Sequence, residues 1–188
     1  MKDNDRCDWC RGDALYESYH DNEWGKPLYD DQKLFEFLIL EGAQAGLSWI
    51  TVLRKRESYR AAMDNFDPYK MAHYDDHKIA ELLSNPGIIR NKLKVNSAVK
   101  NANAYVKIVN ARGSFSEYVW QFVGGKPIIN AYKSMAELPA RSTASEAMSR
   151  QLKKDGFNFV GPTICYAFMQ ATGMVNDHLV DCPEYPHR

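Results

Sequence analysis

The chain lacks the long apolar runs that mark membrane proteins. Its 188 residues contain no run of about 18 apolar residues, so we expect no membrane span. The segment Met1 to Arg6 is polar and leads into no apolar stretch, so we do not expect a signal peptide. A cytoplasmic protein is therefore expected. Disulfides are disfavoured in that compartment, and the four cysteines call for metal binding, packing or catalysis as explanations.

Net charge is also absent, because 24 basic side chains balance 24 acidic ones. This balance excludes a histone-like polycation, but the charges are unevenly distributed. Residues 85–112 contain no Asp or Glu and six basic side chains: Arg90, Lys92, Lys94, Lys100, Lys107 and Arg112. Such a strip fits a nucleic-acid or phosphate contact of limited size, and it fits equally well one solvated face of a helix.

Several motifs of common enzyme classes are missing. The sequence contains no Walker-type glycine-rich loop, no Gly-x-Gly-x-x-Gly after a strand and no nucleophile elbow. We also find no convincing strand, internal repeat or low-complexity linker. The hydrophobic and charged fractions, 45% and 26%, are ordinary for a globular protein. We expect an all-α fold with a single domain spanning residues 1–188.

What the sequence does contain is apolar periodicity of three to four residues, which predicts a series of helices. Residues 7–25 and 124–140 lack this periodicity and are expected to be irregular. Two patterns, Ser114–Glu117 and Thr143–Glu146, are typical of capping boxes. Further helix starts are expected at Asp30 or Asp31, Ser48, Asp67-Pro68 and Gly161-Pro162, and stops at Gly46, Asn85-Pro86-Gly87 and Gly173.

One predicted helix carries an acidic residue on its apolar face. Leu34, Phe37, Leu38 and Glu41 follow the i, i+3, i+4, i+7 spacing, so the carboxylate shares the face that packs into the core. Burial disfavours the charged form and leaves its oxygens in need of partners. Either an Arg or a helix N-terminus pairs with Glu41, or a pocket ligand does so, with Trp49 as a wall of that pocket. From this segment alone, the structural pairing is the first expectation.

Thiol and imidazole side chains occur near both ends of the chain. Cys7, Cys10 and His20 lie near the N-terminus, and His178 and Cys182 lie near the C-terminus. Zinc prefers such ligands, and four of them form a closed structural site. Five candidates are one too many for a tetrahedron, and a catalytic zinc would also need an open position and a general base. The pattern favours a structural zinc that joins the two ends of the chain.

Two glycine-containing turns could hold a phosphate. In a helix-hairpin-helix element, the amides of the turn and of the following helix N-terminus bind phosphate without reading the bases. Residues 156–163 are the better candidate, because Val-Gly leads directly into a helix opened by Pro162. Residues 85–90 are the second, since Arg90, Lys92 and Lys94 would add salt-sensitive attraction. Both segments could instead be ordinary turns between helices.

Four segments carry specific motifs: Tyr19–Gly25, Leu40–Ile50, Gly87–Asn91 and Phe159–Tyr166. Together they resemble the DNA-3-methyladenine glycosylase I family, bacterial enzymes of the helix-hairpin-helix superfamily, over nearly the whole chain. The resemblance implies base excision repair by hydrolysis of the N-glycosidic bond of 3-methyladenine in alkylated double-stranded DNA. It implies the helix-hairpin-helix glycosylase fold, with that element at about residues 143–172.

The resemblance also assigns roles to individual residues. It implies a structural zinc on Cys7, His20, His178 and Cys182, which leaves Cys10 as an extra thiol. It implies that Glu41, the candidate catalytic residue, and Tyr19 hydrogen-bond the base, that Trp49 stacks on it, and that Trp9, Tyr16 and Trp24 complete the pocket. Gly46 and Leu47 would enter the DNA, and the hairpin residues Gly161 and Thr163, with the basic Arg90, Lys92 and Lys94, would contact it. No protein partner is inferred, and family members of this size are usually monomers.

The residue types fit this chemistry. Methylation at N3 makes adenine cationic and a good leaving group, so a carboxylate and aromatic rings favour it once it is flipped out of the duplex. Lyase-active relatives have a Lys near the position of Thr163, and many relatives have an Asp where Asn176 stands. We therefore predict a monofunctional glycosylase that leaves an abasic site. The alternatives are a catalytically inert, zinc-stapled helix-hairpin-helix DNA-binding module and a zinc hydrolase.

Overall fold

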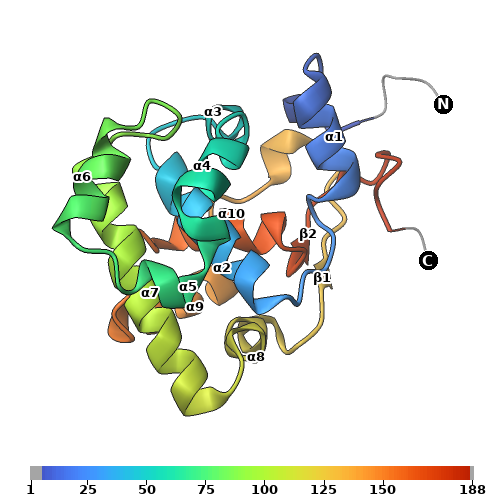
Figure 1. The fold of residues 1–188 in the computed structure, drawn as a ribbon. Coiled ribbons are helices and arrows are strands. Elements are labelled where there is room, and N and C mark those ends of the chain that lie inside the picture. The colour runs from blue at the N-terminus through green and yellow to red at the C-terminus, as the bar shows by residue number, and fades with distance from the viewer. Residues whose placement is uncertain (1–5, 187–188) are drawn as a thin grey trace.

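The computed structural model describes residues 6–186. Most of the segment Met1 to Arg6, in which we expect no signal peptide, lies outside the described residues. The described part is mostly helical (Figure 1), as predicted. Its elements are α1 (Ala14–Asn22), α2 (Asp31–Gln44), α3 (Trp49–Leu53), α4 (Arg56–Ala62), α5 (Pro68–Met71), α6 (Asp76–Ser84), α7 (Lys92–Arg112), α8 (Phe115–Trp120), β1 (Ile128–Ile129), α9 (Thr143–Lys154), α10 (Pro162–Ala171) and β2 (Val175–Asn176). Short 3₁₀ turns at Asp8–Cys10, Asp64–Phe66, Gln121–Val123 and Met135–Glu137 complete them.

Helix α2 lies at the centre of the molecule. In Figure 1 it lies beside α10, with α7 along one side of the pair. Every residue from Leu34 to Ala43 is buried, including Phe35 and Leu40, which lie outside the predicted apolar stripe. A helix that is apolar all round belongs to the interior of a protein. The prediction of a one-faced helix was therefore too narrow, because α2 is packed on all sides.

Three predicted helix starts, at Asp30, Asp67 and Ser114, are confirmed by side-chain caps, although at Ser114 only the bond from the Glu117 amide of the predicted capping box is formed. Ser48 and Gly161 precede α3 and α10 without a side-chain cap bond. The Asp30 carboxylate accepts from the amide of Lys33 at the start of α2. The Asp67 carboxylate accepts from the amide of Tyr69 at the start of α5, where Pro68 is the first helical residue. The second capping box was placed one residue too late. Ser142 and Ser145 form it, each side chain accepting from the other's backbone amide, so Thr143 is the first helical residue. The two serines satisfy the amides of Ser142 and Ser145, where the expected pair would have satisfied those of Thr143 and Glu146.

Two segments predicted to be irregular contain regular structure. Residues 14–22 form α1. The Asp13 carboxylate accepts from the amides of Leu15 and Tyr16 at its N-terminus. The helix buries Tyr19 and His20 rather than an aliphatic stripe, so periodicity did not reveal it. The 124–140 segment contains β1, which pairs in parallel with β2 through only two residues each. Alternation of side chains cannot be recognised in strands of that length.

Helices α9 and α10 pack against each other as a hairpin joined by residues 155–161. The turn begins at Gly156, whose φ of +97° suits a glycine, and it is fastened from inside by the Ser149 hydroxyl, which donates to the Val160 carbonyl at 2.6 Å. Asn101 of α7 exchanges two hydrogen bonds with Asn158. This clamp places the hairpin tip beside the C-terminal half of α2, where Phe159 faces Gly42.

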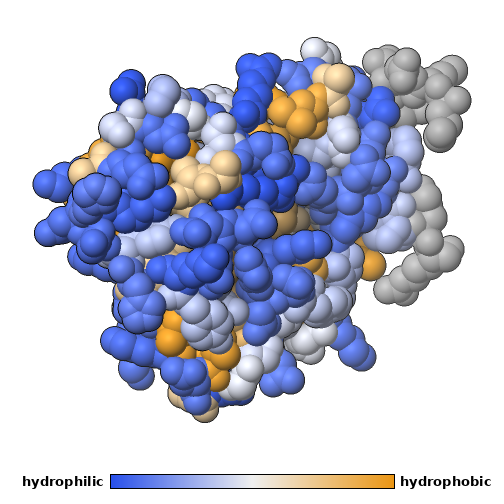
Figure 2. Space-filling model, in the orientation of Figure 1, coloured by the Kyte–Doolittle hydropathy of each residue, from blue (hydrophilic) through white to orange (hydrophobic). Residues whose placement is uncertain are grey.

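The surface view in Figure 2 shows a mainly hydrophilic face with apolar side chains in a few separate patches. None of the described helices has the length and apolar character needed to cross a membrane.

Candidate base-binding pocket and metal centre

A cavity of about 210 Å³ opens between α1, α2, α3 and α10. It brings together all six residues predicted to bind the base: Trp9, Tyr16, Tyr19, Trp24, Glu41 and Trp49. Trp9 comes from the 3₁₀ turn Asp8–Cys10, Tyr16 and Tyr19 come from α1, and Trp24 follows α1 directly, while α2 supplies Glu41 and the start of α3 supplies Trp49. The sequence prediction of an aromatic pocket around Glu41 therefore agrees with the geometry.

Glu41 lies at the base of the cavity, with only 3% of its surface exposed. Its Oε2 and the indole Nε1 of Trp49 are the two buried side-chain atoms, among the described residues, that lack a hydrogen-bond partner. The expectation that an Arg pairs with Glu41 is wrong, because Arg56 binds Glu23 and Arg60 binds Glu36. A buried acceptor and a buried donor without partners mark a place where a polar ligand completes the bonding.

Burial raises the pKa of Glu41 to about 8, since no positive charge or donor compensates the loss of water. The same burial raises the pKa of Tyr19 well above its ordinary value, and the nearby Glu41 carboxylate adds to the effect. Tyr19 therefore stays a neutral hydroxyl that can donate or accept. A cationic ligand would reverse the balance at Glu41 by stabilising its ionised form.

The aromatic walls are held by edge and stacking contacts. Trp49 is backed by Phe37, with ring centroids 6.4 Å apart and planes at 19°, and touches Tyr19 at 5.5 Å. Trp9 packs edge-on against Tyr16 at 4.7 Å and Trp24 at 5.0 Å. Such mutual packing fixes the rings before any ligand arrives and leaves flat apolar faces toward the cavity.

Five further residues line the cavity and were missed from the sequence: Gln44, Met135, Leu138, Ala167 and Gln170. Met135 and Leu138 belong to the 124–140 segment, which gave no signal because its place depends on the two-residue pairing of β1 with β2. Gln170 donates its amide to Asp177 at 2.9 Å, and Asp177 also accepts from Asn130 and Tyr166. The buried Asp177 thus orients the side chain of Gln170 in the pocket. Through Asn130 it also holds the 124–140 segment, which supplies part of the pocket wall.

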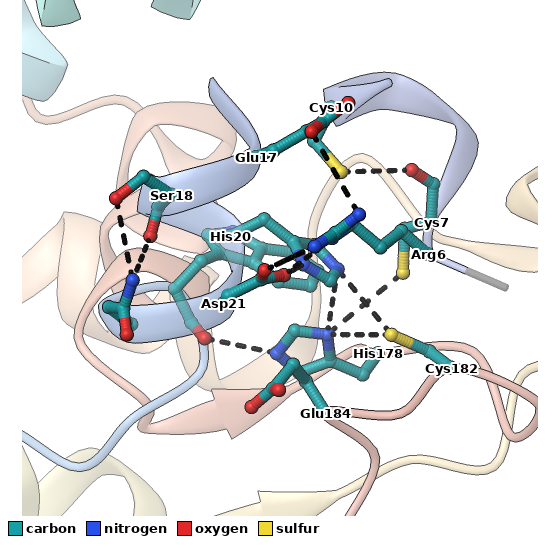
Figure 3. Close-up of polar contacts among 12 residues, drawn as sticks. Arg6, Cys7, Cys10, Glu17, Ser18, His20, Asp21, His178, Cys182 and Glu184 are labelled. Carbon is teal, nitrogen blue, oxygen red and sulfur yellow. Dashed lines mark hydrogen bonds and ion pairs between the residues drawn. The ribbon is translucent and has the colours of Figure 1, made fainter. Parts of the chain in front are cut away.

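A second cluster adjoins the pocket. Cys7, His20, His178 and Cys182 are buried, and one donor atom from each lies within 4.8 Å of the others, so this set could hold a metal ion. Figure 3 shows the four side chains converging from the N-terminal segment, α1 and the C-terminal segment. Cys10 is excluded from the group, because its thiol donates to the carbonyl of Cys7 at 3.2 Å. The five candidates of the sequence are thereby reduced to four.

The outer hydrogen bonds of the two imidazoles show how their inner nitrogens are used. His20 Nδ1 lies 2.8 Å from the Asp21 carboxylate, and His178 Nε2 lies 3.0 Å from the Trp24 carbonyl. Both outer partners are acceptors, so in the neutral imidazoles, the forms that bind metal, the inner nitrogens His20 Nε2 and His178 Nδ1 carry lone pairs although they are 3.1 Å apart. A cation between them would relieve that repulsion, and carboxylate or carbonyl partners behind ligating histidines are common at metal sites.

Two of the donor separations fit a tetrahedral ion, whereas the His20–His178 separation of 3.1 Å is shorter and the Cys7–His178 separation of 4.0 Å is longer than such an ion gives. Cys182 Sγ lies 3.5 Å from the inner nitrogen of each histidine, and Cys7 Sγ lies 4.0 Å from that of His178. Donors 2.0–2.3 Å from a tetrahedral zinc would be separated by roughly 3.3–3.8 Å. Hydrogen bonds from Cys7 and the two histidines lower the pKa of Cys182, which favours the thiolate that a metal requires.

The cluster and the pocket share walls. Trp24 packs edge-on against His178 at 4.7 Å, and Trp9 packs against His20 at 5.4 Å. Two of the rings that line the cavity therefore rest directly on the histidines of the cluster, so the cluster fixes the shape of the pocket.

Comparison with known proteins agrees with this geometry. The sequence matches the methyladenine glycosylase family over residues 9–185. The chain belongs to the methyladenine glycosylase family. Two curated relatives cover nearly all of it. DNA-3-methyladenine glycosylase 1 of Escherichia coli is 50% identical over 97% of both chains, and DNA-3-methyladenine glycosylase of Haemophilus influenzae is 51% identical over 95% of this chain and 96% of its own.

Solved structures of the methyladenine glycosylase family have the same fold. A crystal structure of 3-methyladenine DNA glycosylase I is 50% identical, has a TM-score of 0.95 and covers 96% of this chain and 100% of its own. A Staphylococcus aureus structure that describes 3-methyladenine recognition is 38% identical, with a TM-score of 0.94 and 98% coverage of both chains. The predicted family and mainly helical fold are thereby confirmed.

The residues predicted to contact DNA are not among the residues that line this methyladenine glycosylase pocket. Gly46 and the half-exposed Leu47 form the tip between α2 and α3, with Gly46 at a φ of +79°. Gly161 and Thr163 open α10, which follows the hairpin. Arg90 and Lys92 are exposed just before and at the start of α7. Lys94 differs from them, because its ammonium is bound to carbonyls at the end of α2.

Proposed function

We propose that the protein is a DNA-3-methyladenine glycosylase that acts in base excision repair. It hydrolyses the N-glycosidic bond of 3-methyladenine in alkylated double-stranded DNA. The observation that carries this function is the pair of partnerless buried atoms, Glu41 Oε2 and Trp49 Nε1, in a cavity walled by aromatic rings. An acceptor of this kind suits the cationic, flat base that methylation at N3 produces.

In the proposed reaction, the damaged nucleotide first leaves the duplex, because the glycosidic bond is inaccessible within the stack. The cationic base enters between the rings, and Glu41 releases its proton to solvent and becomes ionised beside it. Glu41 then accepts from the exocyclic amine of the base, which stacks on the Trp49 ring. Water adds to the sugar C1′ and releases one proton to solvent, while the bonding pair of the glycosidic bond moves onto the base, which departs neutral. Unmethylated adenine brings no charge and gains none of this stabilisation.

The same reasoning favours monofunctional hydrolysis. Of the described residues that line the cavity, Glu41 is the carboxylate and none is a lysine. Asn176, at the position of the assisting Asp of many superfamily members, is buried and donates to the Gly25 carbonyl at 3.2 Å. Thr163 stands at the exposed start of α10, where lyases have a lysine. Neither position supplies an amine for a Schiff base.

We further propose that Cys7, His20, His178 and Cys182 hold a structural zinc. Two thiols and two imidazoles are ligands that zinc prefers, and four protein ligands leave no open position for a substrate. When bound, the ion would supply cross-linking of the chain ends and no catalysis. A zinc hydrolase is disfavoured for the same reason.

The proposed DNA contacts involve the Gly46–Leu47 tip and the start of α10. Leu47 would fill the space left by the flipped base, with Gly46 against the lesion strand. The element of residues 143–172 would serve as the helix-hairpin-helix, in which Gly161 and Thr163 approach a phosphate at the N-terminus of α10. The substrate is expected to meet a monomer in the cytoplasm, and no protein partner is proposed.

The test is incubation of the purified protein with methyl-labelled alkylated duplex, followed by chromatography of released bases. We expect free 3-methyladenine and abasic sites that break only after alkali. Failure to release any base would instead support the alternative of an inert DNA-binding module. Borohydride trapping on abasic DNA checks the monofunctional prediction, since a covalent protein–DNA adduct would contradict it.

A further inference from the structure

Lys94 lies in the first turn of α7, where a cation is unfavourable for its own helix. Its ammonium does not point into solvent. Nζ donates to the carbonyl of Ala43 at 2.8 Å and to that of Ala45 at 2.6 Å, both at the C-terminus of α2. These contacts bridge 49 and 51 residues of sequence. The Lys94 ammonium is therefore stabilised by the C-terminus of α2 and not by its own helix.

The backbone of Lys94 is also held in place. Lys94 lines the same small pocket as Ile39, Ala43, Val95 and Ala98. The Lys94 amide donates to the Asn91 cap at 3.1 Å, and its carbonyl accepts from the Ser97 hydroxyl at 2.8 Å. Burial lowers the pKa of Lys94, consistent with an ammonium that has exchanged part of its water for carbonyl oxygens.

The bound carbonyls belong to the turn that matters most for the site. The last carbonyls of a helix have no partners within it, and they carry the negative end of the helix dipole. Ala45 is one turn after Glu41 and directly precedes the Gly46–Leu47 tip. Within the tip, the Leu47 amide donates to the Gln44 carbonyl at 2.6 Å.

We propose that Lys94 is a positioning residue for the glycosylase reaction, rather than a phosphate contact. It caps α2 from α7 and thereby fixes both Glu41 and the Gly46–Leu47 tip relative to the DNA face. This inference rests on the proposed function. It separates Lys94 from Arg90 and Lys92, which are exposed and remain available to phosphates.

The test compares Lys94→Met, which keeps the stem and deletes the ammonium, with Lys33→Met. Lys33 is exposed on α2 at the end away from the pocket, so this control removes the same charge without touching the cap. Three quantities are measured for each protein: the single-turnover rate of base release at saturating enzyme, the salt dependence of duplex binding, and hydrogen exchange of the peptide covering residues 42–49.

For Lys94→Met we expect the saturated rate to fall about 10- to 100-fold, because small displacements of reacting groups have effects of that size. Exchange in residues 42–49 should accelerate, while the slope of log affinity against log salt stays that of wild type. Lys33→Met should match wild type in all three. Lys94→Gln, whose amide can serve one carbonyl, should give an intermediate rate and replaces Lys94→Met if that variant does not fold.

A salt slope reduced by about one with an unchanged saturated rate would overturn the proposal, because that is the behaviour of a phosphate contact. Wild-type exchange and rate in Lys94→Met would overturn it as well. Absence of release by the wild type is a separate result, seen before any variant is compared. It would overturn the proposed function, and the positioning role with it, whereas a normal wild type beside a normal variant refutes only the role of Lys94.

Discussion

At the scale of single residues, Glu41 is the group on which the site depends. The spacing with Leu34, Phe37 and Leu38 was enough to predict that it faces inward, and burial confirms this. What the spacing did not reveal is the missing partner. The arginines that could have paired with Glu41 are engaged elsewhere by Glu23 and Glu36, and pairings between distant segments leave no local pattern.

The raised pKa of Glu41 predicts a pH-dependent rate. If the ionised carboxylate is needed, kcat/KM should climb roughly tenfold per pH unit below about 8 and level off above it. Glu41→Gln should have a low and flat profile over the same range. Steady-state release of 3-methyladenine between pH 6 and pH 9 measures both, and a level wild-type profile from pH 6 to pH 8 would count against the assignment.

The same shift predicts how the free protein's stability depends on pH. Between about 4.5 and about 8 the folded state keeps a proton on Glu41 that the unfolded state releases, so the free energy of unfolding falls as pH rises. In Glu41→Gln the free energy of unfolding does not fall with pH for this reason, because glutamine does not titrate. Its thermal midpoint should therefore exceed that of wild type by a margin that widens from pH 5 to pH 8. An equal margin at both pH values, measured by calorimetry, would refute a protonated Glu41.

At the scale of elements, caps and periodicity predicted most helices, since Asp30, Asp67 and Ser114 act locally. The elements that escaped prediction depend on distant partners. Helix α1 is built on the packing of Tyr19 and His20, and the wall of Met135 and Leu138 stands on a two-residue pairing with β2. The residues predicted to bind the base were identified by family resemblance and not by periodicity.

The start of α7 gives a prediction about the DNA interface. Arg90 and Lys92 are exposed and have no ion pair in the described part of the chain. Each is expected to neutralise a phosphate, so Arg90→Met or Lys92→Met should lower the salt slope of duplex binding by about one. Fluorescence anisotropy at several salt concentrations measures this slope. A slope identical to that of wild type in both variants would remove this turn from the interface.

At the scale of the whole molecule, the Cys/His cluster joins chain segments more than 150 residues apart, as the contacts of His178 with His20 and Cys7 show. Its walls are also those of the pocket, through Trp9 and Trp24. Ligand types near both ends of the chain allowed a metal to be predicted. Only the folded geometry excluded Cys10 from the set.

Removal of the proposed zinc should therefore unfold the protein and not merely inactivate it. Cys182→Ser, or chelation, is expected to lower the thermal midpoint by roughly 10 °C or more, since each kcal/mol moves it by about 2–4 °C in a chain of this size. Cys10→Ser is the matched control and should retain one zinc by elemental analysis. Loss of activity at an unchanged midpoint would point to a catalytic metal instead.

The central claim is that Glu41 recognises the cationic base in the reacting state. Its most direct test is single-turnover release of 3-methyladenine from one alkylated duplex, with wild type and Glu41→Gln at saturating concentration. We expect the variant to be slower by about 10²- to 10³-fold, in line with the loss of one preorganised electrostatic group, while duplex affinity stays the same. Release by Glu41→Gln at a rate within twofold of wild type would contradict the claim.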